Sequence, residues 1–230
     1  MRGEHMAFPY DLVMFDLDGT LVETAPEICD AVNDTLHGLG LPAASLAEVE
    51  RWIGHGTHEL LIAALACATG TDAQAVRASK GLASTSATFD KHYQRRCGTR
   101  SRLYPGVREA LAFLRTQGVK LAVITNKEAR YTDTVLGVHQ LRDSFDRVIS
   151  GDSLPTKKPD PACVHACLHA FDVPKTRALF VGDSSIDAAT ARNAGVEVWL
   201  LPHGYNMGAP IQQCRPDRVI ADFSVLAAEA

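Results

Sequence analysis

Phe15-Asp16-Leu17-Asp18-Gly19-Thr20-Leu21-Val22 is the stretch on which the fold prediction rests, and it follows the apolar residues 12–14. An unbroken apolar run of this kind is typical of a strand buried on both faces of a parallel sheet. In extended backbone, residues two apart point the same way, so Asp16 and Asp18 can converge while Leu17 packs elsewhere. Open α/β sheets carry their sites at the carboxyl ends of their strands. The stretch therefore predicts a buried strand that ends in two functional carboxylates.

Strand-then-helix alternation continues along the rest of the chain. Further apolar runs cover residues 119–124, 147–149, 178–181 and 196–200. Helical patterns lie between them: residues 107–117 end at Gly118, another helix begins at Pro161, and residues 187–194 end at Gly195. From residue 105 onward this alternation predicts an α/β fold with a doubly wound, Rossmann-like and mainly parallel sheet.

One region breaks the alternation. From about Glu23 to Arg102 the apolar residues follow helical periodicity, and no strand stands out. The economical interpretation is an all-helical insert between the first and second strands. We therefore expect residues 1–22 and 103–230 to form the α/β core domain and residues 23–102 to form a helical cap domain. Two covalent connections make such an insert a candidate lid.

Composition argues against several classes of partner. The 230 residues carry 23 Lys and Arg against 27 Asp and Glu, a net charge of −4, which leaves no electrostatic footprint for nucleic acid. No apolar run approaches the ~20 residues of a membrane span. Residues 1–6 lack the apolar stretch of a signal peptide, and the true start is expected near Met6. The six cysteines form no Cys-x-x-Cys pair, so we expect a reduced, cytoplasmic protein, as a monomer or homodimer.

Three further polar motifs follow strand-like runs. Thr125-Asn126-Lys127 ends one run, where a hydroxyl is well placed to meet an anion. In Lys157-Lys158-Pro159-Asp160-Pro161 the prolines fix the backbone beside Lys158, which favours it over Lys157 as the functional lysine. Gly182-Asp183-Ser184-Ser185-Ile186-Asp187 leads into a helix. Beside two other carboxylates Asp183 is favoured as a metal ligand, because a divalent cation relieves the repulsion among them.

These motifs, together with Asp-x-Asp-Gly-Thr-Leu at residues 16–21, resemble in order the four motifs of the haloacid dehalogenase-like phosphohydrolase superfamily. The resemblance spans residues 10–222. It implies that Asp16 is a nucleophile that forms an aspartyl-phosphate, and that Asp18 is the general acid and base. It further implies that the phosphate contacts Thr125, Asn126 and Lys158, with Lys127 adding positive charge. Asp16, Asp18 through its backbone carbonyl, and Asp183 would hold the metal, while Asp187 orients these ligands or Lys158.

Mg²⁺ is the expected cofactor, because hard carboxylate oxygens surround this site and no imidazole or thiolate lies near it in the sequence. Asp18 also separates two branches of the superfamily. The dehalogenases lack an aspartate at this position, since cleavage of a carbon–halogen bond needs no protonated leaving group. Its presence favours phosphate chemistry.

Within the expected insert, Arg51-Trp52-Ile53-Gly54-His55-Gly56-Thr57 resembles the loop that closes over the substrate in the phosphoglycolate phosphatase and β-phosphoglucomutase branch. Its glycines permit close backbone approach, and Arg51 or His55 could meet a substrate carboxylate. A capped helix junction is the alternative interpretation. Gly204-Tyr205-Asn206 also resembles this group, whereas Glu23-Thr24 and His55 depart from its usual Asp-Ser and Asn.

The resulting prediction is a Mg²⁺-dependent phosphatase of a small phosphorylated metabolite, most plausibly 2-phosphoglycolate. A phosphosugar phosphatase, for instance one acting on N-acetylmuramic acid 6-phosphate, is an alternative, as is a phosphomutase whose lid excludes water. A non-enzymatic aspartate phosphoacceptor switch belongs to a different class. Asp18 argues against it, because a switch needs no acid for a leaving group.

Overall fold

Six parallel strands form the centre of the structure, a computed structural model that describes residues 8–228. The prediction for residues 1–6 lies outside this range. The strands are β1 (Leu12–Phe15), β4 (Lys120–Ile124), β5 (Arg147–Ile149), β6 (Ala178–Gly182), β7 (Glu197–Leu200) and β8 (Arg218–Val219). Their order is β5-β4-β1-β6-β7-β8, so the chain winds outward from β1 in both directions. A ligand crevice is expected at the carboxyl end of β1, where the winding reverses.

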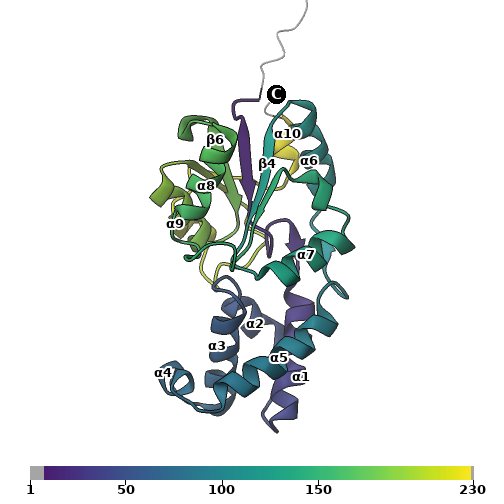
Figure 1. Cartoon of the computed structure of the whole chain (residues 1–230), viewed down its shortest axis with the longest axis vertical. Coiled ribbons are helices and arrows are strands. Elements are labelled where there is room, and N and C mark those ends of the chain that lie inside the picture. The colour runs from purple at the N-terminus through teal and green to yellow at the C-terminus, as the bar shows by residue number, and fades with distance from the viewer. Residues whose placement is uncertain (1–7, 229–230) are drawn as a thin grey trace, which may run out of the picture.

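Helices cover both faces of this sheet, which confirms the predicted doubly wound α/β class (Figure 1). On one face lie α6 (Val107–Thr116), α7 (Ala129–Val138) and α10 (Ser224–Ala228), and on the other lie α8 (Ala162–Phe171) and α9 (Ser185–Ala194). Alternate residues of β1 serve the two faces: Val13 and Phe15 pack in one core cluster, Leu12 and Met14 in the other. This alternation fixes which way Asp16 can point, because its position continues the strand.

Five helices stand between β2 (Val22–Glu23) and β3 (Arg102–Leu103), and we call them the helical insert. They are α1 (Ala25–Gly38), α2 (Leu46–Trp52), α3 (Thr57–Thr69), α4 (Ala73–Arg77) and α5 (Leu82–Arg96). In Figure 1 they lie below the sheet, at the edge where the strands end. No strand was predicted between residues 23 and 102, but β2 and β3 pair antiparallel at the exits of the insert. Two-residue strands carry no periodicity to detect.

Short 3₁₀ helices complete the described elements: η1 (Arg142–Ser144), η2 (Lys175–Arg177) and η3 (Ile211–Cys214). The six cysteines are unpaired. Within residues 8–228 no helix combines the length and the apolar character that crossing a membrane requires.

Candidate active site

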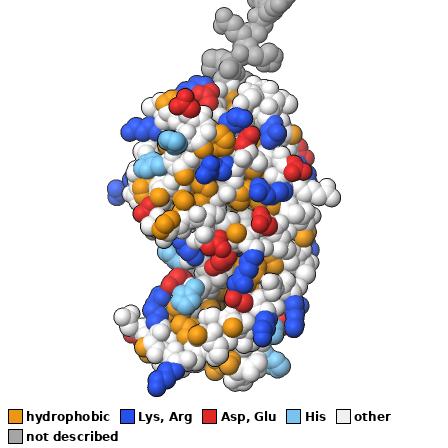
Figure 2. All heavy atoms as spheres, viewed as in Figure 1, with side chains coloured by type: hydrophobic (Ala, Val, Ile, Leu, Met, Phe, Trp, Pro, Cys, Tyr) orange, Lys and Arg blue, Asp and Glu red, His pale blue; other side chains and the backbone are white. Residues whose placement is uncertain are grey.

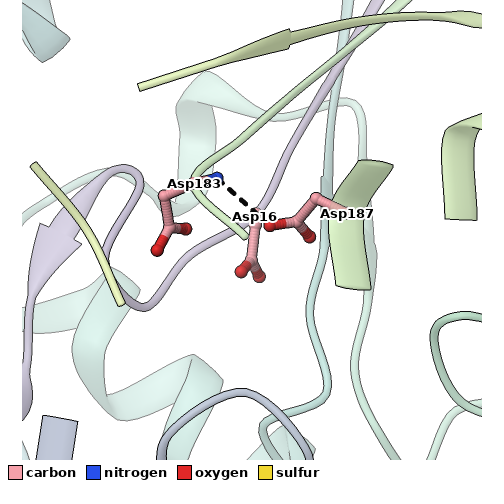
Figure 3. A group of neighbouring side chains, drawn as sticks. All are labelled: Asp16, Asp183 and Asp187. Atoms are coloured by element: carbon pink, nitrogen blue, oxygen red, sulfur yellow. Dashed lines mark hydrogen bonds between the residues drawn. The ribbon is translucent and has the colours of Figure 1, made fainter. Parts of the chain in front are cut away.

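Three carboxylates meet where β1, β6 and α9 come together. Ligand oxygens of Asp16, Asp183 and Asp187 lie within 4.8 Å of one another (Figure 3). Burial is the main cause that raises the pKa of Asp16, to about 7, while Lys158 opposes the rise. The pKa of Asp183 is also raised, by burial and by the charges of Asp187 and Asp16. Such a cluster of oxygen ligands could hold a hard divalent cation.

The Lys158 ammonium group pairs with two carboxylates of this cluster. Its Nζ lies 2.9 Å from Asp16 Oδ1 and 2.7 Å from Asp187 Oδ1, and its side chain is 3% exposed. Burial alone would lower the pKa of Lys158, but the two carboxylates outweigh it and raise the pKa. Lys157 is far more exposed and lies 3.9 Å from Glu128 instead. The preference for Lys158 over Lys157 therefore agrees with where the two side chains lie.

Both oxygens of Asp187 are already engaged by the protein. Oδ1 accepts from Lys158, and Oδ2 accepts from the Ser184 hydroxyl at 2.7 Å and from the Asp183 and Ser184 amides at 3.1 Å. Ser184 caps α9 in return, because its hydroxyl accepts from the Asp187 amide. Asp187 thus anchors the neighbouring groups of the cluster in fixed positions.

Asp183 is held from two sides. Oδ1 accepts from the Thr20 hydroxyl at 2.5 Å, and Oδ2 accepts from the Tyr205 amide at 2.6 Å. Gly204 approaches so closely that a Cβ built on it would lie 2.1 Å from Oδ2. The turn after β1 is equally tight, since Gly19 has φ +87° and its Cβ would lie 2.5 Å from the same oxygen. The sequence resemblance that includes Gly204 does not predict this close approach to Asp183.

The side chain of Asp18 is not part of the carboxylate cluster. Its Oδ1 accepts from the Thr24 hydroxyl at 2.7 Å and from Lys127 Nζ at 2.8 Å, while Oδ2 lies 3.1 Å from the same Nζ. The metal ligand expected from Asp18 is its backbone carbonyl, so the side-chain carboxylate is not needed as a ligand. Lys127, expected beside the phosphate, contacts Asp18 and lines a cavity together with Asp16.

Thr125 and Asn126 lie at the end of β4, beside the cluster, and differ in what they can still bind. Thr125 is buried and its hydroxyl accepts from the Lys127 amide at 3.2 Å, which leaves its own proton to donate. The Asn126 amide donates to the carbonyls of Gly54 and Lys158 and accepts from the Lys158 amide. In this conformation Asn126 ties Lys158 to the helical insert.

A small cavity lies between the end of the sheet and the helical insert. Its lining combines the polar residues of the β1 and β4 ends with apolar and glycine residues of the insert: Asp16, Asp18, Thr125, Asn126 and Lys127 face Ile28, Ile53, Gly54, Gly56, Thr57 and Leu60. The centre of a water molecule can occupy about 30 Å³ of it, which is room for about one or two waters. The insert therefore narrows the space at the carboxyl ends of β1 and β4 to a small cavity.

Arg51 and His55 are exposed and do not line this cavity. The Arg51 side chain lies against Gly208, where it borders a second, open cleft beside α2 and residues 202–212. Figure 2 shows the outline of the molecule hollowed where the helical insert meets the α/β part. In this conformation the insert faces the site with three apolar side chains, two glycines and one threonine: Ile28, Ile53, Leu60, Gly54, Gly56 and Thr57.

Comparison with known proteins shows which family the chain belongs to. The model for haloacid dehalogenase-like hydrolases matches residues 13–201. The chain belongs to this family. A phosphoglycolate phosphatase of Pseudomonas putida is 39% identical over 98% of this chain and 83% of its own length. That of Nitrosospira multiformis is 40% identical over 94% of this chain and 93% of its own. A solved structure from Haemophilus somnus, of a predicted phosphoglycolate phosphatase, has a TM-score of 0.89 at 34% identity and covers 96% of this chain and 97% of its own.

The haloacid dehalogenase-like assignment confirms the resemblance drawn from the four motifs, and the protein is a hydrolase homologous to phosphoglycolate phosphatases. Its catalytic class therefore rests on similarity along nearly the whole chain. The carboxylates of this haloacid dehalogenase-like enzyme lie in a position that suits a metal.

Proposed function

We propose that the protein is a Mg²⁺-dependent phosphatase that hydrolyses 2-phosphoglycolate through an aspartyl-phosphate on Asp16. The observation that carries the proposal is the buried cluster of Asp16, Asp183, Asp187 and Lys158 beside a cavity of about 30 Å³. Relatives at about 40% identity named phosphoglycolate phosphatase support the choice of substrate. We further propose that it acts in the cytoplasm, for which the six unpaired cysteines are the support.

In the proposed first step, an oxygen of Asp16 attacks phosphorus in line, and the bond to the substrate's bridging oxygen breaks. Asp18 gives a proton to that oxygen and later takes one from the water that hydrolyses the aspartyl-phosphate. Lys158 and the Thr125 hydroxyl would stabilise charge on the transferring group. Asp16, Asp183 and the Asp18 carbonyl would hold Mg²⁺, which supplies further neutralisation of that charge when bound.

The lining of the cavity favours a small substrate over a phosphosugar or a bisphosphate, because Ile28, Ile53 and Leu60 offer no hydrogen bonds to sugar hydroxyls. The space itself holds about one or two waters, which is too little for any phosphate ester. The helical insert must therefore move to admit substrate. We propose residues 23–102 as the moving cap and residues 1–22 with 103–230 as the core.

A panel of phosphate-release assays with Mg²⁺ tests this proposal. The substrates are phosphoglycolate, glycerol phosphate, N-acetylmuramic acid 6-phosphate, glucose 6-phosphate, a nucleotide and pyrophosphate. We expect the highest kcat/KM for phosphoglycolate and many turnovers per enzyme. Faster release of phosphate from a sugar phosphate than from phosphoglycolate would show that phosphoglycolate is not the preferred substrate. A single phosphate retained per chain, without release, would indicate a phosphoacceptor switch.

Binding of Mg²⁺ should weaken as the pH falls from 8 to 6. Without metal, burial raises the pKa of Asp16 to about 7 and that of Asp183 above its usual range, so protons compete with the cation for these oxygens. Each displaced proton lowers the affinity by up to about tenfold per pH unit below its pKa. Calorimetric titration in two buffers of different ionisation enthalpy measures both the affinity and the protons released. An affinity that is flat between pH 6 and 8 would contradict this expectation.

Substituting Gly204 by alanine should weaken Mg²⁺ binding at least about tenfold, an effect of the size that follows when the groups supporting a metal ligand are lost. The new methyl group would lie 2.1 Å from Asp183 Oδ2 and displace that carboxylate. Gly137→Ala in α7 is the matched control, because nothing lies within 4 Å of its Cβ position, and helix propensity favours alanine there. Calorimetric Mg²⁺ titration of both variants checks the prediction, and equal affinities would refute it.

A further inference from the structure

The site contains two buried lysines, and they serve different carboxylates. Lys158 Nζ lies between Asp16 and Asp187. Lys127 Nζ contacts both oxygens of Asp18, at 2.8 and 3.1 Å, and its side chain is 2% exposed. Among the ion pairs of residues 8–228, none joins Lys127 to the carboxylate cluster. The Lys127 ammonium group therefore pairs with Asp18 and not with the carboxylate cluster.

Lys127 is enclosed on its other side by the helical insert. Its Nζ lies 5.1 Å from the centre of the Tyr93 ring on α5, a contact between a cation and an aromatic face. Lys127 also lines the cavity together with Asp16 and Asp18. Burying an ammonium group is costly unless it is paired, so the ion pair with Asp18 holds this side chain in a single place.

The contacts of Asp18 distinguish its two oxygens. Oδ1 accepts from Thr24 at 2.7 Å and from Lys127 at 2.8 Å, whereas within residues 8–228 Oδ2 has only the longer contact to Lys127 Nζ at 3.1 Å. A carboxylate oxygen accepts at least two hydrogen bonds, so Oδ2 keeps the capacity to bind a proton. Two donors on Oδ1 fix the rotation of the carboxyl group, and with it the direction of Oδ2.

We propose that Lys127 is a positioning residue that holds Asp18 for proton transfer to the leaving group, a role that rests on the proposed phosphatase function. As the bond from phosphorus to the bridging oxygen breaks, its electron pair stays on that oxygen. Asp18 Oδ2 gives its proton to the same oxygen. Asp18 is then a carboxylate, and the Lys127 ammonium beside it stabilises the new charge until Asp18 takes a proton from the attacking water.

This role makes the effect of Lys127 depend on the leaving group. An alkoxide needs a proton as it leaves, whereas p-nitrophenolate departs without one. We expect Lys127→Met to lower the single-turnover rate of aspartyl-phosphate formation about 10²-fold for phosphoglycolate and for ethyl phosphate, within the range for loss of general acid catalysis. For p-nitrophenyl phosphate we expect less than about a fivefold change in that rate, and for all three substrates less than about a threefold change in KM. Lys127→Arg should restore part of the rate of aspartyl-phosphate formation from the two alkyl esters.

Lys120→Met is the matched control, because Lys120 also pairs with an aspartate, at 3.4 Å from Asp146, but is about half exposed at the start of β4. It should leave all three substrates unchanged. A retained burst of p-nitrophenolate shows that Lys127→Met is folded. If it does not fold, Lys127→Gln and Thr24→Val provide the same comparison, since the first removes the positive charge beside Asp18 and the second removes a hydroxyl donor to it.

Two outcomes would overturn the proposal. A loss confined to KM for phosphoglycolate would show that Lys127 binds the substrate carboxylate, and equal losses on all three substrates would show a general structural role. Asp18→Asn, assayed in parallel, separates this from failure of the proposed function. If the rate at which that variant forms the aspartyl-phosphate shows no dependence on the leaving group, the role of Asp18 itself is wrong. If it shows the dependence and the Lys127 variants do not, only the positioning role is wrong.

Discussion

Asp16→Asn is expected to abolish phosphate release, with kcat falling by at least about 10⁴-fold, as is usual when a nucleophile is removed. An asparagine amide is a far weaker nucleophile than a carboxylate, and it cannot supply the negative charge that a metal beside Asp183 requires. The variant keeps nearly the same shape, so the Lys158 ammonium remains in place between residue 16 and Asp187. Release of inorganic phosphate from phosphoglycolate measures the effect. Substantial turnover by the variant would refute the assignment of Asp16 as the nucleophile.

The same substitution should stabilise the metal-free protein at alkaline pH. Burial raises the pKa of Asp16 from its ordinary 3.8 to about 7 in the folded protein. The folded state therefore loses stability as the pH rises through this range, and the loss is complete at pH 8. Below pH 3.8, where Asp16 is protonated in both states, this loss disappears. Removing that charge should raise Tm by about 2–4 °C per kcal/mol gained. Thermal unfolding in EDTA at pH 8 and pH 5 checks the sign. A Tm that falls at pH 8 would show that Asp16 contributes stability and would contradict the expectation.

Asp18→Asn is expected to lower kcat for phosphoglycolate by about 10²–10⁴-fold, the range over which general acid–base catalysis contributes. The amide can still accept hydrogen bonds from Thr24 and Lys127, which contact this side chain now. It cannot give a proton to the departing alkoxide or take one from water. Both proposed steps should therefore slow.

Single-turnover kinetics separates these two steps for Asp18→Asn. With p-nitrophenyl phosphate, whose leaving group needs no proton, formation of the aspartyl-phosphate should stay fast while its hydrolysis remains slow. A burst of one p-nitrophenolate per enzyme followed by a slow phase is the expected trace. Unchanged steady-state kcat with phosphoglycolate would rule out the role assigned to Asp18.

The strand-and-helix architecture could be predicted because apolar strand runs and helix ends are visible within short stretches of sequence. The buried run before Asp16 forms the central strand β1. Parallel strands end at one edge of the sheet, so Asp16 and Asp183, which are 167 positions apart, were expected together and lie together. Strand β8 was missed, because Arg218 and Val219 are exposed and too few to show periodicity.

The directions of individual side chains could not be predicted in the same way, because distant segments decide them. The Asn126 amide is taken up by the backbone of Gly54 and Lys158, segments 72 and 32 positions away. Lys127 turns to Asp18, while Arg51 lies against Gly208 outside the cavity. These directions depend on contacts between segments far apart in the sequence, and two of them, Asn126 with Gly54 and Arg51 with Gly208, join the helical insert to the α/β part.

The antiparallel pairing of β2 with β3 makes the helical insert an exchangeable module. Val22 pairs with Leu103 and Glu23 with Arg102, so the chain leaves the α/β part and returns to it at neighbouring points. Shortening, lengthening or replacing what lies between these points changes a loop whose ends are already together, and the cost of loop closure grows only slowly with length. The six-stranded sheet would keep its register through such an exchange. Under the proposed function, a graft bounded by residues 23 and 102 would change the lining of the cavity while it leaves Asp16, Asp183 and Asp187 in place.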